Sequence, residues 1–198
     1  MKLHYGTASP YVRKVMVVAH EKGLIDDIEL ISNSPWEEND LGKYNPVGKI
    51  PALEMDDGMV LVDSRVICEF LDARGGGDPL YPQGRNRWRV LRQAALGDGI
   101  LEAGVGLAIE GRKDPAHWSE WYAERLREKI NRTLDCLETE AGSLDGPLDI
   151  GALTVGCALG YLDFRGYVGD WRPGRPELAN WYADFAGRPS MQATEPRD

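Results

Sequence analysis

The chain has 198 residues, of which 42% are hydrophobic and 28% charged, and its formal net charge is −9 at pH 7. This composition is typical of a globular protein, and the length allows one large domain or two small ones, each with its own core. The negative charge argues against nonspecific binding to nucleic acids or acidic membranes. No apolar run approaches the roughly 18 residues of a membrane span, and no signal peptide follows Met1, so we expect a cytoplasmic protein without membrane contact.

The cysteines and histidines indicate neither a disulfide framework nor a metal site. Cys68, Cys136 and Cys157 are odd in number and form no CxxC motif, which favours buried structural thiols for all three. The three histidines show no spacing typical of metal ligands. We therefore expect no metal.

The first part of the chain alternates short strands and helices. Strands are predicted at residues 2–5, 28–31, 52–55 and 59–62, and an Asp-Gly turn makes the last two a hairpin. Helices are predicted to begin at Ser9-Pro10, at Ser34-Pro35 and at Asp63-Ser64, where a capping residue or proline opens each one. The order β-α-β-α-β-β-α predicts a thioredoxin-like α/β domain over residues 1–77.

The rest of the chain predicts an all-helical bundle domain over residues 85–198, joined by a proline-rich linker at 78–84. Helices are predicted from Arg85 to about Glu110 and from starts at Asp114-Pro115, Asp149 and Pro176. The second of these carries an apolar stripe at helical spacing, formed by Trp118, Trp121, Tyr122, Leu126, Ile130, Leu134 and Leu137. The four glycines at 97, 99, 104 and 106 leave two alternatives open, a close helix contact, which we prefer, or room for a bulky ligand.

The stretch from Asn45 to Glu54 contains two prolines and a glycine and then turns into a strand. Pro51 cannot donate a ladder hydrogen bond, so it belongs at the first residue of the strand or on an edge. An X–Pro bond adopts the cis form at a cost of only about 0.5–1 kcal/mol. On this stretch alone two interpretations stay open, a tight turn without a ligand or a loop that offers the backbone of Ile50 to a peptide-like ligand.

Four motifs, in this order and spacing, resemble the soluble glutathione S-transferase family of bacterial type over the whole chain. They are Ser9-Pro10-Tyr11-Val12-Arg13-Lys14, Asn45-Pro46-Val47-Gly48-Lys49-Ile50-Pro51-Ala52-Leu53, Asp63-Ser64-Arg65-Val66-Ile67 and Gly160-Tyr161-Leu162-Asp163-Phe164-Arg165. The resemblance implies a detoxifying homodimer that binds glutathione as co-substrate. It further implies that the glutathione thiol attacks a small hydrophobic electrophile. The alternative is a non-catalytic glutathione-binding or regulatory protein of the same fold.

The resemblance also assigns residues to glutathione. Pro51 would be a cis-proline that leaves the Ile50 backbone free to pair with the cysteinyl part of the tripeptide. Asp63 and Ser64 would receive the γ-glutamyl end, with Ser64 also acting as a helix N-cap. Lys49 would lie beside the glycine carboxylate, as the best candidate for a local positive charge in an acidic protein.

Ser9 stands where the family places a thiol-activating residue, and Tyr5 is its rival. A helix dipole and a charge-assisted hydrogen bond together would lower a thiol pKa of about 8.5 by about 1–2 units. The alternative is that Ser9 only caps its helix. Trp36 would flank glutathione or be a half-buried loop residue. The wall of the hydrophobic substrate site is assigned to Tyr11, Leu101, Val105 and Ala108.

Two further features bear on the resemblance. Arg13 and Arg65 are additional candidates for positive charge, either solvated or facing a dimer mate. The family's apolar helix usually begins with a capping box, whereas here Asp149 keeps the cap and Ala152 stands at the third position. We expect the helix start to be held less firmly, by about 0.5–2 kcal/mol if the cap were lost altogether.

Overall fold

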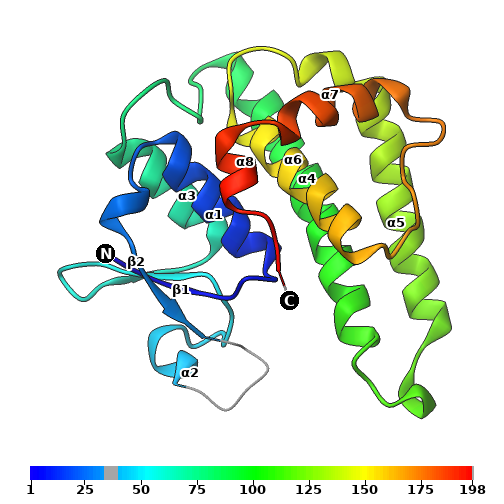
Figure 1. Cartoon of the computed structure of the whole chain (residues 1–198), viewed down its shortest axis with the longest axis horizontal. Coiled ribbons are helices and arrows are strands. Elements are labelled where there is room, and N and C mark those ends of the chain that lie inside the picture. The colour runs from blue at the N-terminus through cyan, green and yellow to red at the C-terminus, as the bar shows by residue number, and fades with distance from the viewer. Residues whose placement is uncertain (34–39, 198) are drawn as a thin grey trace. The chain divides into compact units, whose positions relative to one another are not determined.

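A computed structural model of the chain describes residues 1–33 and 40–197 (Figure 1). The chain divides into two compact units, one formed by Met1–Tyr81 with Pro189–Asp198 and the other by Pro82–Arg188. The division differs from the predicted ranges because residues 189–198 group with the first unit and not with the helices before them. Within the described residues, no helix combines the length and the apolarity that a membrane crossing requires.

The first unit is built on a four-stranded sheet in the order β2-β1-β3-β4. β1 (Lys2–Tyr5) and β2 (Glu29–Ser32) are parallel, whereas β3 (Ala52–Glu54) pairs antiparallel with both β1 and β4 (Val60–Leu61). Its helices are α1 (Pro10–Glu21), α2 (Leu41–Tyr44), α3 (Ser64–Arg74) and α8 (Pro189–Ala193), with a 3-10 turn η1 at Ile25–Asp27. The predicted thioredoxin-like order is confirmed. The predicted helix start at Ser34-Pro35 lies outside the described residues.

The core of the first unit follows the predicted apolar periodicity. α1 packs against α3, and the fully buried side chains come from both helices and from the two central strands. They include Leu3, Val15, Leu53, Ile67 and Leu71. Because the sheet and these two helices share one core, the loops that join them are held at fixed positions.

The second unit is helical and consists of α4 (Arg85–Glu110), η2 (Pro115–His117), α5 (Glu120–Thr139), η3 (Ala141–Ser143), α6 (Ile150–Arg165) and α7 (Pro176–Ala186). α6 is buried along almost its whole length, as its continuous apolar sequence predicts, and packs against α4 and α7. The predicted all-helical part of the fold is therefore confirmed. α8 was not predicted, because five residues are too few to show a helical period.

The predicted start of the fifth helix at Asp114-Pro115 is wrong. Asp114 caps only the short turn η2, where its Oδ1 accepts the Ala116 N–H at 2.9 Å, and α5 begins after Ser119. The predicted apolar stripe is buried only from Leu126 onward, and Trp121 is 72% exposed. Leu126 lies against Gly106, one turn before α4 ends at Glu110. The helix α4 covers the buried part of the stripe. The first turns of α5 extend beyond the end of α4, so the aromatic side chains there are exposed.

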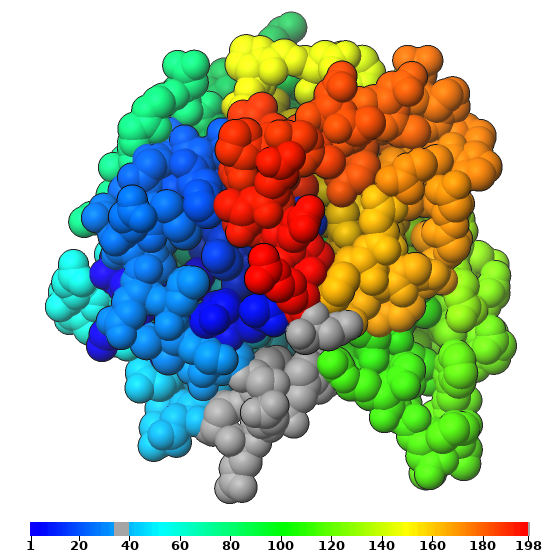
Figure 2. Space-filling view, viewed as in Figure 1, coloured from blue at the N-terminus to red at the C-terminus, as the bar shows by residue number. Residues whose placement is uncertain are grey.

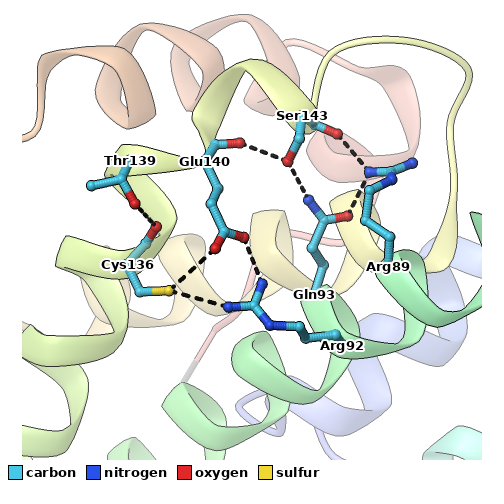
Figure 3. A network of polar contacts seen from close by, with 7 residues as sticks. All are labelled: Arg89, Arg92, Gln93, Cys136, Thr139, Glu140 and Ser143. Carbon is cyan, nitrogen blue, oxygen red and sulfur yellow. Dashed lines mark hydrogen bonds and ion pairs between the residues drawn. The ribbon is translucent and has the colours of Figure 1, made fainter.

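A polar network joins the second turn of α4 to the end of α5 (Figure 3). Arg92 donates to Glu140 at 2.6 Å, and the Cys136 sulfur lies 3.5 Å from Arg92 Nη2 and 3.6 Å from Glu140 Oε1. Cys136 is therefore a half-buried thiol with polar partners, so the expectation of a buried structural thiol is wrong for Cys136 and confirmed for Cys68 and Cys157, which are buried. Figure 3 shows the sulfur facing this ion pair.

An arginine of the same network contacts the residue that caps α6. Asp149 Oδ1 accepts the Ala152 N–H at 2.9 Å, which confirms the predicted cap. Asp149 Oδ2 lies 3.4 Å from Arg89, and Arg89 also donates to the Ser143 carbonyl at 2.8 Å. A guanidinium only donates, so Arg89 holds the Asp149 side chain in place and does not supply the acceptor that a complete capping box offers to the backbone N–H of the cap residue.

Candidate functional site

Three strands of the first unit have one end at the same side of the sheet, which we call the sheet edge: β1 and β4 finish there, and β3 begins there. The register pairs His4 with Ala52 on one side of β3 and Leu53 with Leu61 on the other. Continuing both registers places Tyr5 and Asp63 on either side of Pro51. The end of β1, the start of β3 and the end of β4 thus bring the predicted site residues to the same edge.

Ser9 caps α1, as predicted. Its backbone is extended, with φ −82° and ψ 119°, and its Oγ accepts the Val12 N–H at 3.3 Å, with Pro10 as the first helical residue. A hydroxyl offers one donor and two acceptor lone pairs. Because the cap uses only an acceptor position, capping is compatible with donation of the Ser9 O–H to a bound thiolate. Tyr5 is the last residue of β1 and is half-buried.

The loop before β3 is a turn held by side-chain hydrogen bonds. The Ile50–Pro51 peptide is cis, as predicted. Asn45 is buried, its Oδ1 accepts the Val47 N–H at 3.0 Å and its Nδ2 donates to the Lys49 carbonyl at 2.7 Å. Asn45 thereby orients the peptide unit that carries the Ile50 N–H. The sequence analysis assigned no role to Asn45, although asparagine readily forms such a turn with its own backbone.

The loop before β3 packs on the turn that carries Ser9. A Cβ built on Gly6 would lie 3.0 Å from the Ile50 side chain and 3.7 Å from the Asn33 carbonyl. The Gly6 carbonyl in turn accepts the Ser9 N–H at 3.1 Å. Glycine is needed here because the Ile50 side chain approaches its backbone so closely. This contact brings Ile50 and Ser9 into one neighbourhood.

The start of α3 is capped by Asp63, and the expectation that Ser64 is the N-cap is wrong. Asp63 has the extended backbone of a cap and its Oδ1 accepts the Arg65 N–H at 2.8 Å, whereas Ser64 is the first helical residue and is buried. α1 and α3 therefore both begin at the same edge of the sheet. Unpaired N–H groups and the positive end of the helix dipole make such helix starts favourable places for an anion.

His4 lies beneath this edge as a structural residue. It is 2% exposed, its Nδ1 lies 2.6 Å from Asn33 Nδ2, and its ring lies against that of Tyr44 at a tilt of 35°, with 4.2 Å between centroids. Burial lowers the pKa of His4, while the carboxylate of Glu54 acts in the opposite direction. The imidazole is therefore neutral at pH 7, and its Nδ1 can accept the Asn33 amide. Among the described residues, no group of three or more potential ligands is arranged to hold a metal ion.

The remaining candidate residues have different environments. Lys49 is exposed beside the cis peptide, as a carboxylate-binding lysine requires. Leu101 is fully buried in the helical unit, so none of its side chain is open to a ligand and we remove it from the substrate wall. The other assigned wall residues, Tyr11, Val105 and Ala108, are each half-buried. Trp36 lies outside the described residues.

The expectation that Arg13 is solvated or faces a dimer mate is wrong. Its side chain is only 7% exposed, and its Nη2 donates to the Met191 carbonyl at 3.0 Å in a buried hydrogen bond. The partner residue comes from the end of the chain, which the sequence did not connect with α1. Arg65, by contrast, is exposed.

Comparison with known proteins identifies the family of the chain. The glutathione S-transferase N-terminal domain model matches residues 8–74 and the C-terminal domain model matches residues 119–184. The uncharacterized GST-like protein YibF of Escherichia coli K12 is 34% identical over 99% of this chain and 98% of its own.

Two solved structures are also similar over their whole length. A glutathione transferase family member from Pseudomonas fluorescens Pf-5, crystallised with bound glutathione, is 46% identical, with a TM-score of 0.95 over 100% of this chain and 99% of that one. A glutathione S-transferase from Methylobacillus flagellatus KT with glutathione bound is 35% identical, with a TM-score of 0.92 over 99% of both chains. The chain belongs to the glutathione S-transferase family.

Proposed function

We propose that the protein is a glutathione transferase, which binds glutathione at the sheet edge of its first unit and activates the thiol for attack on a hydrophobic electrophile. The observation that carries the proposal is the position of Ser9. Its hydroxyl caps α1 at the edge where the cis-Pro51 loop and the start of α3 also lie. Similar proteins crystallised with bound glutathione support the choice of ligand.

In this proposal each part of the tripeptide meets a matching group. The Ile50 backbone, oriented by Asn45, pairs with the cysteinyl unit as an added strand would. Asp63 binds the α-ammonium of the γ-glutamyl unit of glutathione. The carboxylate of the same γ-glutamyl unit binds Ser64 and the N–H groups at the start of α3. Lys49 binds the glycine carboxylate and supplies a local positive charge in a protein whose net charge is −9.

The chemistry requires only that the thiolate be stabilised and placed. The Ser9 O–H donates to the sulfur, and the start of α1 adds its dipole. Together these lower the thiol pKa from about 8.5 by about 1–2 units, enough to make the thiolate the main species at neutral pH. The thiolate then attacks the electrophilic carbon and the leaving group departs with the displaced electron pair. Tyr5, at the end of β1, is the alternative donor.

The proposal includes a homodimer in the cytoplasm. Trp88 and Trp121 of the helical unit are each 72% exposed, and exposed aromatic side chains of this size are typical of protein interfaces. Light scattering of the purified protein measures the oligomeric state. None of the three cysteines forms a disulfide, which agrees with a reducing compartment.

Replacing Ser9 by alanine should raise the pKa of the bound thiol by about 1 unit, since the dipole of α1 remains, and lower kcat below that pKa by about tenfold. The pH–rate profile for conjugation of a chloro-nitroaromatic should shift to higher pH, because more base is needed to form the thiolate. Glutathione affinity, measured by calorimetry, should change by less, since most of the tripeptide contacts other residues. Tyr5→Phe is the matched variant and should leave the profile unchanged.

Three other outcomes would revise the proposal. A normal rate in Ser9→Ala with a shifted profile in Tyr5→Phe would move activation to the tyrosine. Glutathione binding without turnover in the wild type would favour a non-catalytic glutathione-binding protein. The absence of glutathione binding would refute the site itself.

Replacing Asn45 by alanine should weaken glutathione binding by about tenfold, since two hydrogen bonds of about 0.5–1.5 kcal/mol each hold the loop that presents Ile50. Asn45→Asp keeps the acceptor for Val47 but cannot donate to the Lys49 carbonyl, so it isolates the second contact. Calorimetry on both variants tests this. Unchanged affinity in both would show that the loop keeps its shape without Asn45.

A further inference from the structure

The end of the chain runs along α1 inside the first unit. α8 packs against α1, and Figure 1 shows the two helices side by side. The described residues of this C-terminal segment, 189–197, contact α1 and the turn before it at three levels. Ser190 Oγ donates to Glu21 at 2.5 Å, Arg13 donates to the Met191 carbonyl at 3.0 Å, and the Arg197 N–H donates to the Thr7 carbonyl at 3.4 Å. In Figure 2 the red end of the chain lies against the blue residues of the same unit.

Arg13 makes the central contact, and its burial is costly. The side chain is 7% exposed, and its Nε is buried without a hydrogen-bond partner among the described residues. Moving a guanidinium out of water costs free energy unless all its N–H groups find hydrogen-bond acceptors. An apolar side chain would fill this place at lower cost. The specific feature that arginine provides is its hydrogen bond to the Met191 carbonyl.

Arg13 and Ser9 belong to the same helical turn. The Arg13 N–H donates to the Ser9 carbonyl at 3.0 Å, and the neighbouring Val12 N–H donates to Ser9 Oγ at 3.3 Å. On the other side of Ser9, Thr7 lies in the turn that is closed by the hydrogen bond from the Ser9 N–H to the Gly6 carbonyl. The C-terminal segment therefore contacts the chain on both sides of Ser9, at Arg13 and at Thr7.

We propose that the C-terminal segment positions the Ser9 hydroxyl, and that Arg13 is the positioning residue through which it acts. The proposal rests on the function proposed above. A hydrogen bond to a thiolate depends steeply on geometry, and a displacement of about 1 Å near a reacting group costs up to about 100-fold in rate. With Arg13 anchored on α8, the first turn of α1 keeps one position and the Ser9 O–H keeps one direction.

The test replaces Arg13 by methionine, which keeps an unbranched side chain as far as the position of Nε and removes the guanidinium. We expect the pKa of the bound glutathione thiol to rise and kcat below that pKa to fall about 3–10-fold, with the glutathione dissociation constant within about twofold of the wild type. Hydrogen exchange of the Val12 amide, which donates to Ser9 Oγ, should become faster. This last measurement requires no catalysis.

Two matched comparisons separate positioning from general stability. Ser190→Ala removes the contact with Glu21, at the far end of α1, so it should lower stability without changing the thiol pKa or Val12 exchange. Arg197→Pro removes the N–H that donates to Thr7, whereas Arg197→Ala keeps it. Only the proline variant should shift the thiol pKa.

The outcomes distinguish this proposal from the proposed function. If Arg13→Met lowers the melting temperature but leaves the thiol pKa, kcat and Val12 exchange unchanged well below that temperature, Arg13 is merely structural and the positioning proposal is overturned. If the wild type shows no turnover, the transferase proposal fails. Faster hydrogen exchange of the Val12 amide in Arg13→Met, and not in Ser190→Ala, would still support the inference that the C-terminal segment positions Ser9.

Discussion

Replacing Asp72 by alanine should lower the free energy of unfolding of the first unit by about 3–5 kcal/mol, the usual cost of removing one partner of a buried ion pair. Asp72 lies near the end of α3, and its Oδ1 is 3.0 Å from Lys22 Nζ. The side chains of Lys22 and Asp72 are only 2% and 8% exposed. Without the carboxylate, the Lys22 ammonium would stay buried and uncompensated.

Asp72 also holds the chain where it leaves the first unit. Its two oxygens accept the N–H groups of Leu80 at 2.9 Å and Tyr81 at 3.1 Å, while Lys22 donates to the Asp78 carbonyl at 3.0 Å. Leu80 and Tyr81 are buried. Residues 78–81 of the predicted linker are thus a fixed part of this unit, so the loss of Asp72 should also release them.

Chemical denaturation, together with hydrogen exchange at Leu80 and Tyr81, measures both effects. Glu128→Ala is the matched control, because its ion pair with Arg132 spans 3.6 Å on the exposed face of α5 and such pairs contribute about 0.3–0.5 kcal/mol. The double variant Lys22→Met with Asp72→Leu should recover part of the loss, since it leaves no buried charge. Equal costs for Asp72→Ala and Glu128→Ala would show that the buried pair adds nothing.

The features that were predictable from the sequence are those that short segments decide. Ser9 and Asp149 cap helices because their side chains reach N–H groups three residues ahead, and the sequence alone shows this spacing. The cis form of the Ile50–Pro51 peptide was expected from the family motif around it. The order of strands and helices along the chain and the helical unit followed from the periodicity of the apolar residues.

The features that the sequence did not show depend on residues far apart in the chain. Nothing near Arg13 indicates that its partner is Met191, and Asp72 resembles any acidic residue near the end of a helix until Lys22 is placed beside it. Trp121 continues the periodicity of α5 but lies beyond the helix that covers the stripe. Periodicity identifies the apolar face of a helix, whereas the length over which that face is covered depends on its neighbours.

The four glycines of α4 are a case where the sequence left two alternatives open, and one pair of variants should separate them. Gly97→Ala should destabilise the helical unit by about 1–3 kcal/mol, as overpacked cores do. A Cβ at Gly97 would lie 2.9 Å from the carbonyl carbon of Thr154 in α6. Because that atom belongs to the backbone of a buried helix, the two helices would have to move apart.

Gly99 lies on the same helix but faces open space, with no heavy atom within 4 Å of a built Cβ. Gly99→Ala should therefore stabilise the helix by about 1 kcal/mol, the intrinsic advantage of alanine over glycine. Denaturation of the two variants should differ by about 2–4 kcal/mol in the free energy of unfolding. Gly104 and Gly106 also face a neighbouring helix closely, because a Cβ on either would lie 2.9 Å from a side-chain atom, of Tyr161 and Leu126 respectively, although these side chains can yield more easily than the backbone that Gly97 meets.

Close helix packing thus explains three of the four glycines, and the alternative of room for a bulky ligand has only Gly99 left to support it. A stabilised Gly97→Ala variant would mean that α4 and α6 are not in close contact. The electrophile would then have space inside the helical unit itself. A destabilised Gly97→Ala variant with a stabilised Gly99→Ala variant would confine any such space to the exposed side of α4, where Gly99 lies.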